Sequence, residues 1–358
     1  MTTTNTRFPQ QSGGRTVDPI LNERIVALAN SVDGYLQDKL LPLLFDGTNV
    51  PEGQEAMWSG TVQRVNEGAF FGDPDVTTLV ARGETMPIFE GVGYDPITYE
   101  ADEYAMAVRI PRGDAKMIQS GSTPNSDIQL VGAVELMKLD REKILALLLM
   151  TLTNWRNGET LGAAAFWDAA TSDPNEDLSD AVYAVGGYGQ KPNVCVLGRL
   201  AAHNLRTNAA FLEFDDMTKD RTILNDERLK EVISSRYGIK HVFIGDVVTR
   251  DSGESQDDEM TGTNVWNSNV FVGYLPMSDS GVPAAGITAG QLNGTNDLIP
   301  MQKTAAGRVK VEDWTVRFSE HVGFLESTDY RSVNYTEKVF TVLEPLGYVI
   351  ETQGSSAT

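Results

Sequence analysis

Apolar residues recur at spacings of three and four over residues 126–155, and this period predicts one long helix. The positions that share the spacing are Ile128, Val131, Val134, Met137, Leu145, Leu148, Leu152 and Trp155. Ser126 and Gln129 form a capping box at its start, and Asn157-Gly158 predicts its end. About thirty helical residues give a rod of roughly 45 Å, long enough to act as a spine, with a gap in the apolar pattern at Arg141.

The residues before this helix predict a polar arm, a helix and a pair of strands. Residues 1–17 are polar, so we expect a flexible tail. Asp18-Pro19 reads as an N-cap and first helical position, which predicts a helix over about 19–40 that ends before Pro42. Residues 56–120 have strand character, with apolar positions alternating from Tyr104 up to Ile110. We expect two long strands around a Gly/Pro-rich turn, projecting from the body.

Beyond residue 170 short helices alternate with short apolar runs. Asp173-Pro174 caps a helix ended by Gly186-Gly187, and Asn225 caps another closed by Gly238. The apolar face of the first is Leu178, Ala181, Val182 and Val185. Between these two lies a predicted helix at 199–207, followed by an extended stretch through Phe211 and Phe214. Buried strands are predicted at 192–198, 241–245 and 269–275.

The C-terminal part again predicts strands. Val309, Val311, Trp314, Val316 and Phe318 largely alternate with polar residues, and a last strand or pair spans 339–350. We expect Leu145, Leu148 and Leu152 of the long helix to pack against these strands around Trp314 and Val316.

Composition and charge limit the possible functions. The chain has 358 residues, 41% of them hydrophobic, which is enough for a sizeable core. Its 50 Asp and Glu against 29 Lys and Arg give a net charge of −21. Generic nucleic-acid binders and peripheral binders of anionic membranes need a basic face, so both classes are disfavoured. The longest apolar run, 144–150, is too short to cross a bilayer, and no secretory signal is recognisable; we expect a soluble protein made in a cytoplasm.

The sequence offers little catalytic chemistry. Cys195 is the only cysteine and is expected to be a buried strand residue. Of the three histidines, His203 is expected on a short helix as a surface or packing residue. G-x-S-x-G, P-loop and Rossmann motifs are lacking. The acidic run 251–259 lacks EF-hand spacing, and Tyr94, Tyr99 and Tyr104 are expected to pack between strands. We therefore predict no catalytic, cofactor-binding or metal-binding residues, no cofactor, and no enzymatic activity.

An ordered series of short motifs resembles the major capsid proteins of tailed bacteriophages, which have the Hong Kong 97-type capsid fold. The segments that carry this resemblance are Gly34-Tyr35, 38–42, 104–111, Phe166-Trp167-Asp168, Ser172-Asp173-Pro174, 192–198, 205–208, 229–233, 237–245 and 265–274. It spans roughly residues 30 to 350. Two features depart from the family: the acidic loop 251–264 is longer, and 45–51 replaces a proline-rich strand.

The resemblance implies an α+β capsid subunit. Its parts would be an N-terminal arm with helix at 1–57, an extended β-hairpin loop at 58–120, a peripheral domain with the spine helix at 121–190, an axial α/β domain at 191–312, and returning C-terminal strands at 313–358. Such subunits self-assemble, as hexamers and pentamers, into an icosahedral shell around double-stranded DNA. The implied location is the virion, after assembly in the bacterial host cytoplasm.

The implied partners are further copies of the chain together with portal, scaffolding and decoration proteins, with no membrane and no sequence-specific DNA contact. Two other functions stay open at this stage. An encapsulin-like compartment shell would hold protein cargo, and an α/β enzyme is the more distant alternative. The acidity has two readings: an inner wall that repels DNA, or solubility alone.

Overall fold

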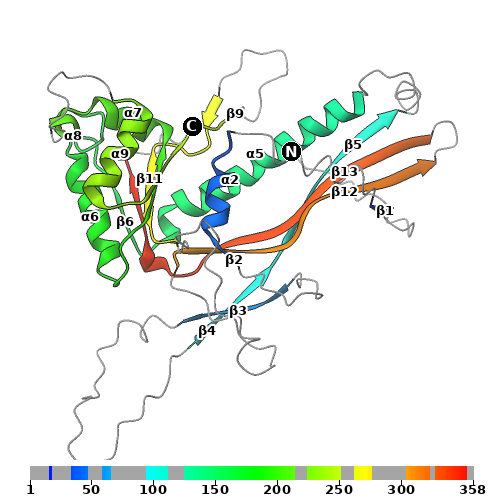
Figure 1. Cartoon of the computed structure of the whole chain (residues 1–358), viewed down its shortest axis with the longest axis horizontal. Coiled ribbons are helices and arrows are strands. Elements are labelled where there is room, and N and C mark those ends of the chain that lie inside the picture. Colours follow the sequence, from blue (N-terminus) through cyan, green and yellow to red (C-terminus); the bar gives the residue numbers. More distant parts are fainter. Residues whose placement is uncertain are drawn as a thin grey trace, which may run out of the picture. The chain divides into compact units, whose positions relative to one another are not determined.

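The computed structural model has a mixed α+β fold (Figure 1). It describes residues 16–17, 34–46, 59–65, 94–111, 125–213, 224–250, 262–275, 304–322 and 327–352. The chain divides into two compact units. Unit 1 takes most of its described residues from Glu103–Lys138 and Glu312–Thr336; unit 2 takes them from Gly34–Asp102, Leu139–Val311 and Glu337–Thr358.

Unit 2 is built on a five-stranded sheet in the order β6-β14-β11-β7-β8. The strands are β6 (Asn157–Thr160), β14 (Gly347–Glu351), β11 (Asn269–Gly273), β7 (Val194–Gly198) and β8 (His241–Gly245). β11 runs antiparallel to both of its neighbours, whereas β6 pairs parallel to β14 and β8 parallel to β7. The three buried strands predicted from apolar runs are thus confirmed as β7, β8 and β11. β8 is an edge strand, and it is only partly buried.

Helices cover both faces of this sheet. On one face Cys195 and Leu197 pack with α6 (Pro174–Gly186), α7 (Arg199–Thr207) and α9 (Asp226–Tyr237). On the other face Val194 and Val196 pack with the C-terminal half of α5 (Asn125–Met150). The side-chain alternation of a strand therefore divides the core into two layers.

The predicted caps explain the boundaries of α6 and α9. The Asp173 carboxylate accepts a hydrogen bond from the Asn175 backbone N–H at 3.0 Å. Asn225 does the same for the backbone N–H of Arg228 at 2.8 Å, and Gly238 ends α9 at a φ of 71°. That left-handed conformation costs glycine little. Helix α7 also has its predicted bounds.

The extended stretch predicted after α7 is wrong, because residues 209–213 form a further helix, α8 (Ala209–Glu213). The Asn208 side chain causes this restart. Its Oδ1 accepts a hydrogen bond from the Phe211 backbone N–H at 3.1 Å, as an N-cap does, and the Phe211 side chain is fully buried. Phe214 lies outside the described residues.

Helix α5 begins where predicted but ends at Met150, so the predicted end at Asn157-Gly158 is wrong. The side chain of Asn154 donates to the Leu148 carbonyl at 2.9 Å, and the Trp155 indole donates to the Leu149 carbonyl at 3.0 Å. These bonds satisfy carbonyls that the helix end leaves free. A short 3₁₀ turn, Leu152–Asn154, follows, and Asn157 then pairs with Tyr348 as the first residue of β6.

The buried stripe of α5 also differs from the predicted one. Its buried apolar residues are Leu130, Ala133, Val134, Met137, Leu145, Ala146, Leu149 and Met150, whereas Val131 and Leu148 are only half-buried. Nearly every position from 144 to 150 is apolar, so spacing alone could not choose the inward face.

In unit 1 the N-terminal part of α5 packs against strands. The strand path is β1 (Thr16–Val17), β12 (Ala306–Val322), β13 (Ser327–Thr341) and β5 (Asp102–Pro111). Trp314 and Tyr335 form a core with Leu130, Val134 and Met137. The expected packing of Leu145, Leu148 and Leu152 around Trp314 is therefore wrong: Leu145 belongs to the core of unit 2.

The strand region before α5 holds three strands where two were predicted. β3 (Ser59–Val65) pairs antiparallel with β4 (Tyr94–Glu100), from Ser59 opposite Glu100 to Val65 opposite Tyr94. β5 follows after Ala101 and pairs with β13, in the sheet that also contains β12 and β1. Residues 66–93, the expected hairpin tip, lie outside the described residues.

Several N-terminal and loop expectations also fall outside what is described. Of the predicted helix over 19–40, only its end can be compared: α2 (Gln37–Leu40) leads into a 3₁₀ turn, Leu41–Leu43, that includes Pro42. Phe45–Asp46 forms β2, which pairs parallel with β12. Residues 251–261, most of the acidic loop, are not described except by sequence. None of the described helices has the length and apolarity to span a membrane.

Candidate functional site

The thiol that the sequence singled out is inert. Cys195 lies in the middle of β7 with no exposed surface, and burial raises the pKa of its thiol to about 12. A thiolate nucleophile is therefore not available at neutral pH. His203 is exposed on α7, as expected, and His321 lies on β12, where its side chain is outside the described set.

The other candidate residues serve packing or lie outside the described chain. Tyr104 stacks on Tyr335 with ring centroids 4.8 Å apart, and Tyr99 packs against the unit 2 core, as predicted for strand residues. Among the described side chains, no group of three or more His, Cys, Asp and Glu is arranged to hold a metal ion.

The first notable surface of unit 2 is acidic and lies on the β6 side of the sheet. Residues 157–190 carry six Asp and Glu and no Lys or Arg. Five of the six influence one another or their shared neighbour Tyr348 electrostatically; this acidic patch consists of Glu159, Asp173, Glu176, Asp177 and Asp180.

The pKa of Asp177 shows that these acids lie close enough to influence one another. Its Oδ2 accepts a hydrogen bond from the Trp167 indole at 2.7 Å. Burial raises the pKa of the Asp177 carboxyl to about 6, with the Trp167 bond opposing and the negative charges of Glu159, Asp173 and Glu176 adding to the rise. Like charges this close are unfavourable unless a cation or a positive surface approaches.

The outer side of α6 joins this patch to an exposed aromatic ring. Glu176, Asp180 and Tyr183 follow one another at spacings of four and three, which places them on one face of the helix. The Tyr183 side chain is 82% exposed, the most of any large apolar or aromatic residue singled out among the described ones. Exposed tyrosine is enriched at protein interfaces, where one end of the ring is apolar and the other polar.

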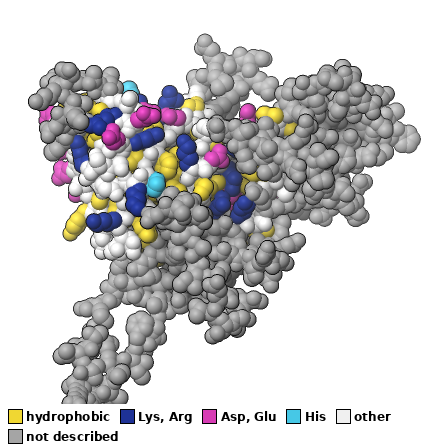
Figure 2. All heavy atoms as spheres, viewed as in Figure 1, with side chains coloured by type: hydrophobic (Ala, Val, Ile, Leu, Met, Phe, Trp, Pro, Cys, Tyr) yellow, Lys and Arg dark blue, Asp and Glu magenta, His cyan; other side chains and the backbone are white. Residues whose placement is uncertain are grey.

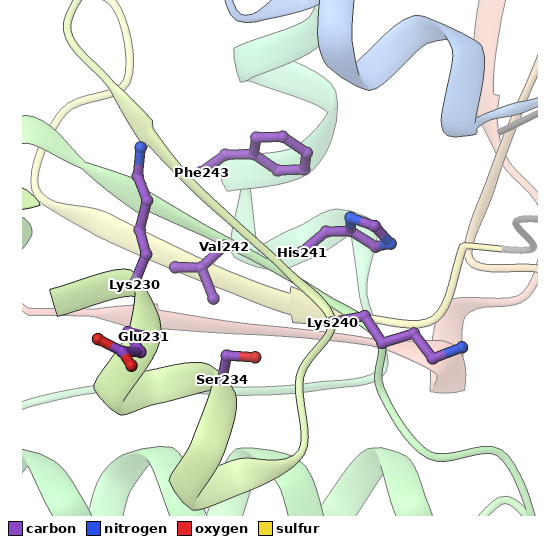
Figure 3. Close-up of a pocket in the computed structure, with 7 residues that line it drawn as sticks. All are labelled: Lys230, Glu231, Ser234, Lys240, His241, Val242 and Phe243. Carbon is purple, nitrogen blue, oxygen red and sulfur yellow. The ribbon is translucent and has the colours of Figure 1, made fainter. Parts of the chain in front are cut away.

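The second surface is a groove at the other edge of the sheet, between α9 and β8. It has a volume of about 330 Å³ and is lined by Lys230, Glu231, Ser234, Lys240, His241, Val242 and Phe243; we call it the basic groove. In Figure 3 the two lysines lie at the ends, with His241, Val242 and Phe243 between them. On the described face in Figure 2, Lys and Arg side chains lie among Asp and Glu side chains and apolar ones.

Two lysines set the sign of this groove. The Glu231 carboxylate is engaged by the Arg228 guanidinium, with Nη1 to Oε2 at 2.8 Å. Burial, and then the charge of Lys240, lower the pKa of His241, which favours the neutral imidazole. Its ring stacks on Phe243 at 6.3 Å between centroids. The groove therefore combines ammonium groups with apolar side chains from both faces of the edge strand β8.

A buried acid on α5 joins two other segments of unit 2 to that helix. The fully buried carboxylate of Glu142 on α5 accepts hydrogen bonds from the backbone N–H groups of Leu36 and Gln37, at 3.1 and 2.7 Å. It also accepts one from the indole of Trp266, at 2.7 Å. Trp266 in turn lies so close to Gly245, the last residue of β8, that a Cβ there would meet the indole at 2.2 Å.

Arg141, which precedes Glu142 on α5, forms a second buried polar contact. The Arg141 guanidinium holds the Glu337 carboxylate with two hydrogen bonds, the Nε to Oε1 bond being 2.6 Å long, and both side chains are less than 10% exposed. This pair fixes α5 to the C-terminal end of β13. The gap that Arg141 makes in the apolar pattern thus marks a polar contact inside unit 2.

Sequence reasoning missed both the basic groove and the acidic patch. A signal was present in the distribution of charge: residues 191–250 carry ten Lys and Arg against eight Asp and Glu, in a chain with a net charge of −21. The groove itself needs the parallel pairing of β7 with β8 and the packing of α9, which periodicity does not reveal.

Comparison with known proteins gives a likeness of fold only. No protein-family model matches the chain, and no curated protein matches its sequence. A phage-related protein from Bordetella bronchiseptica RB50 is similar in structure, with 18% identity, a TM-score of 0.63, and coverage of 97% of this chain and 100% of that one. The present chain therefore shares the fold of a phage-related protein.

Two further solved structures are similar at lower scores. The virus-like particle from Pyrococcus furiosus has a TM-score of 0.49 and 12% identity, covering 93% of this chain and 98% of that one. Mycobacterium phage Che8 has a TM-score of 0.43 and 12% identity, covering 97% and 96%.

Proposed function

We propose that this chain is the major capsid protein of a tailed bacteriophage, with a Hong Kong 97-type fold, and that it assembles into an icosahedral shell around double-stranded DNA. The observation that carries the proposal is the likeness of fold to a phage-related protein over 97% of the chain. The ordered sequence motifs between residues 30 and 350 support it independently.

The form of the secondary structure also supports a shell subunit. Helix α5 has 26 residues, and strands β12 and β13 have 17 and 15. Helices average about 11–12 residues and strands about 5–6 in globular proteins. Long elements suit a subunit that makes extended contacts with its neighbours. In this proposal the arm is 1–57, the extended loop 58–120, the peripheral domain 121–190, the axial domain 191–312 and the returning strands 313–358.

The proposed partners are other copies of the chain, arranged as hexamers and pentamers, with portal, scaffolding and decoration proteins. The shell assembles in the cytoplasm of the bacterial host and becomes part of the virion. It contacts DNA without reading sequence, and it has no enzymatic activity. The inert Cys195 and its high thiol pKa are consistent with a structural role.

Expression in bacteria, with and without the neighbouring genes, followed by sedimentation and negative-stain electron microscopy tests this proposal. We expect closed particles of uniform size. Particles that enclose a co-expressed enzyme and lie in a gene neighbourhood without portal and terminase genes would instead indicate a compartment shell. A dispersed subunit under all these conditions would contradict both shell functions.

A further inference from the structure

We propose that copies of this chain join head to tail, with the outer face of α6 of one copy seated in the basic groove of the next. The α6 face is defined by Glu176, Asp180 and Tyr183. This inference rests on the proposed self-assembly and adds to it the surfaces that make one contact.

Charge complementarity is the first argument. The acidic patch and the basic groove belong to the same unit: the patch includes Glu159 of β6 and the groove includes residues of β8, which are the two edge strands of the sheet. In a chain with a net charge of −21, two copies should repel unless positive surface meets negative surface. The groove supplies Lys230 and Lys240 to face the acids of α6, and such opposition also excludes the wrong orientation of two copies.

Complementary polarity within each surface is the second argument. On α6 an aromatic ring, Tyr183, lies next to Asp180 along one helix face. In the groove Val242, on the α9 face of the edge strand β8, and Phe243, on the opposite face, lie between two lysines. A tyrosine that enters the groove from the α9 side would contact Val242, while Asp180, one helical turn before it, meets a lysine ammonium group. Buried aromatic anchors surrounded by polar pairs are typical of interface centres.

The two surfaces are different, so the contact is heterologous. Each copy offers one α6 face and one basic groove. Successive copies therefore form a closed ring when the rotation from one copy to the next divides a full turn evenly. Hexamers and pentamers are rings of this kind. A two-fold contact would instead require one surface to match itself.

Charge reversal with rescue tests the pairing. Asp180→Lys and Lys240→Glu should each raise the protein concentration needed for particle formation by about tenfold or more, as loss of an interfacial charge pair does. The double variant Asp180→Lys/Lys240→Glu should assemble nearly as well as the wild type. Glu344→Lys, which changes an exposed charge elsewhere, is the matched control and should leave assembly unchanged.

The aromatic contact has its own pair of variants. Tyr183→Ala should weaken assembly, whereas Tyr183→Phe should retain most of it. Because the side chain is 82% exposed, neither change should alter the melting temperature of the free subunit. Circular dichroism of each variant, read beside light scattering of assembly, separates a folding defect from an assembly defect.

The outcomes separate this inference from the proposed function. If the wild type forms no particles, the proposed function fails. If the wild type assembles and the single reversals assemble equally well, or the folded double variant is no better than the singles, the head-to-tail pairing is wrong while the shell function stands. The head-to-tail pairing is supported if each single reversal weakens assembly and the double variant restores it.

Discussion

The indole Nε1 of Trp266 donates a hydrogen bond of 2.7 Å to the carboxylate of Glu142, which lies 124 positions earlier in the chain. The same carboxylate accepts backbone N–H groups from the start of α2. One side chain therefore fastens three separate parts of unit 2: the long helix, the segment 34–44 and the turn before β11. Burial raises the pKa of Glu142, and the three hydrogen bonds lower it and so offset part of that rise.

Replacing Glu142 with alanine should destabilise the protein by about 2–4 kcal/mol. The change leaves three donors without an acceptor in the interior, and an unsatisfied buried donor costs about 1–3 kcal/mol. Urea unfolding followed by tryptophan fluorescence measures the loss. Asp140→Ala, at an exposed position of the same helix, is the control and should change stability by about 0.5 kcal/mol or less. Equal unfolding midpoints for the two variants would mean that the Glu142 contacts contribute nothing.

The acidic patch predicts a pH-dependent effect at Asp177. Its folded pKa of about 6 lies above the ordinary value of 3.8, so the group's favourable contribution is complete below pH 3.8 and is lost as pH rises through 6. Asp177→Asn keeps an oxygen acceptor for Trp167 and removes the charge. At pH 7 we expect this variant to be more stable than the wild type by about 1 kcal/mol, because solvent screens a half-buried group.

Thermal melts at pH 4 and pH 7 measure this difference. The stabilisation by Asp177→Asn should be present at pH 7 and nearly absent at pH 4. Asp168→Asn, at an exposed position of the same acidic segment, should have a small effect at both pH values. A stabilisation of the same size at pH 4 would show that charge repulsion is not its cause.

The face of α5 that is buried can be tested with two leucines of one helical turn. Leu149 is fully buried in the unit 2 core, whereas Leu147 is 66% exposed. Leu149→Ala should cost about 2–5 kcal/mol, the usual range for a buried leucine, and Leu147→Ala should be nearly neutral. Chemical unfolding of both variants gives the comparison. A larger loss of stability in Leu147→Ala than in Leu149→Ala would show that the inward face of α5 has been assigned incorrectly.

Local signals allowed much of unit 2 to be predicted. Asp173 and Asn225 cap their helices through hydrogen bonds made within three residues, and Gly238 ends α9 through its own backbone conformation. Such features depend on neighbours along the chain, so the sequence contains them directly. The apolar runs at β7 and β11 were equally clear, because strands buried on both faces need no alternation.

Long-range contacts account for what was missed. Asn157, predicted as a helix end, instead begins β6 by pairing with Tyr348, and a ladder between such distant residues leaves no mark in the local pattern. The bond from Trp266 to Glu142 is equally invisible to periodicity. The basic groove brings Lys230 and Lys240 together from α9 and the start of β8, and only the folded sheet provides that proximity.

The free subunit should bind duplex DNA only weakly, with a Kd around 10⁻⁴ M at physiological salt, the weak end of the non-specific range. Its basic residues do not form a run of five, and the net charge of −21 opposes approach of a polyanion. Titration of short duplex DNA with subunit at two salt concentrations measures the affinity. Submicromolar binding with a steep salt dependence would point instead to a nucleic-acid-binding surface, with Arg7 and Arg15 of the N-terminal arm as the first residues to examine.

An icosahedral cryo-electron microscopy reconstruction of the purified particles tests the central claim most directly. We predict closed shells in which every subunit shows the five-stranded sheet of unit 2 with α5 on one face and α6, α7 and α9 on the other, arranged as rings of six and five copies. A protein that remains a dispersed monomer or a small symmetric oligomer, both alone and beside its neighbouring gene products, would contradict the account.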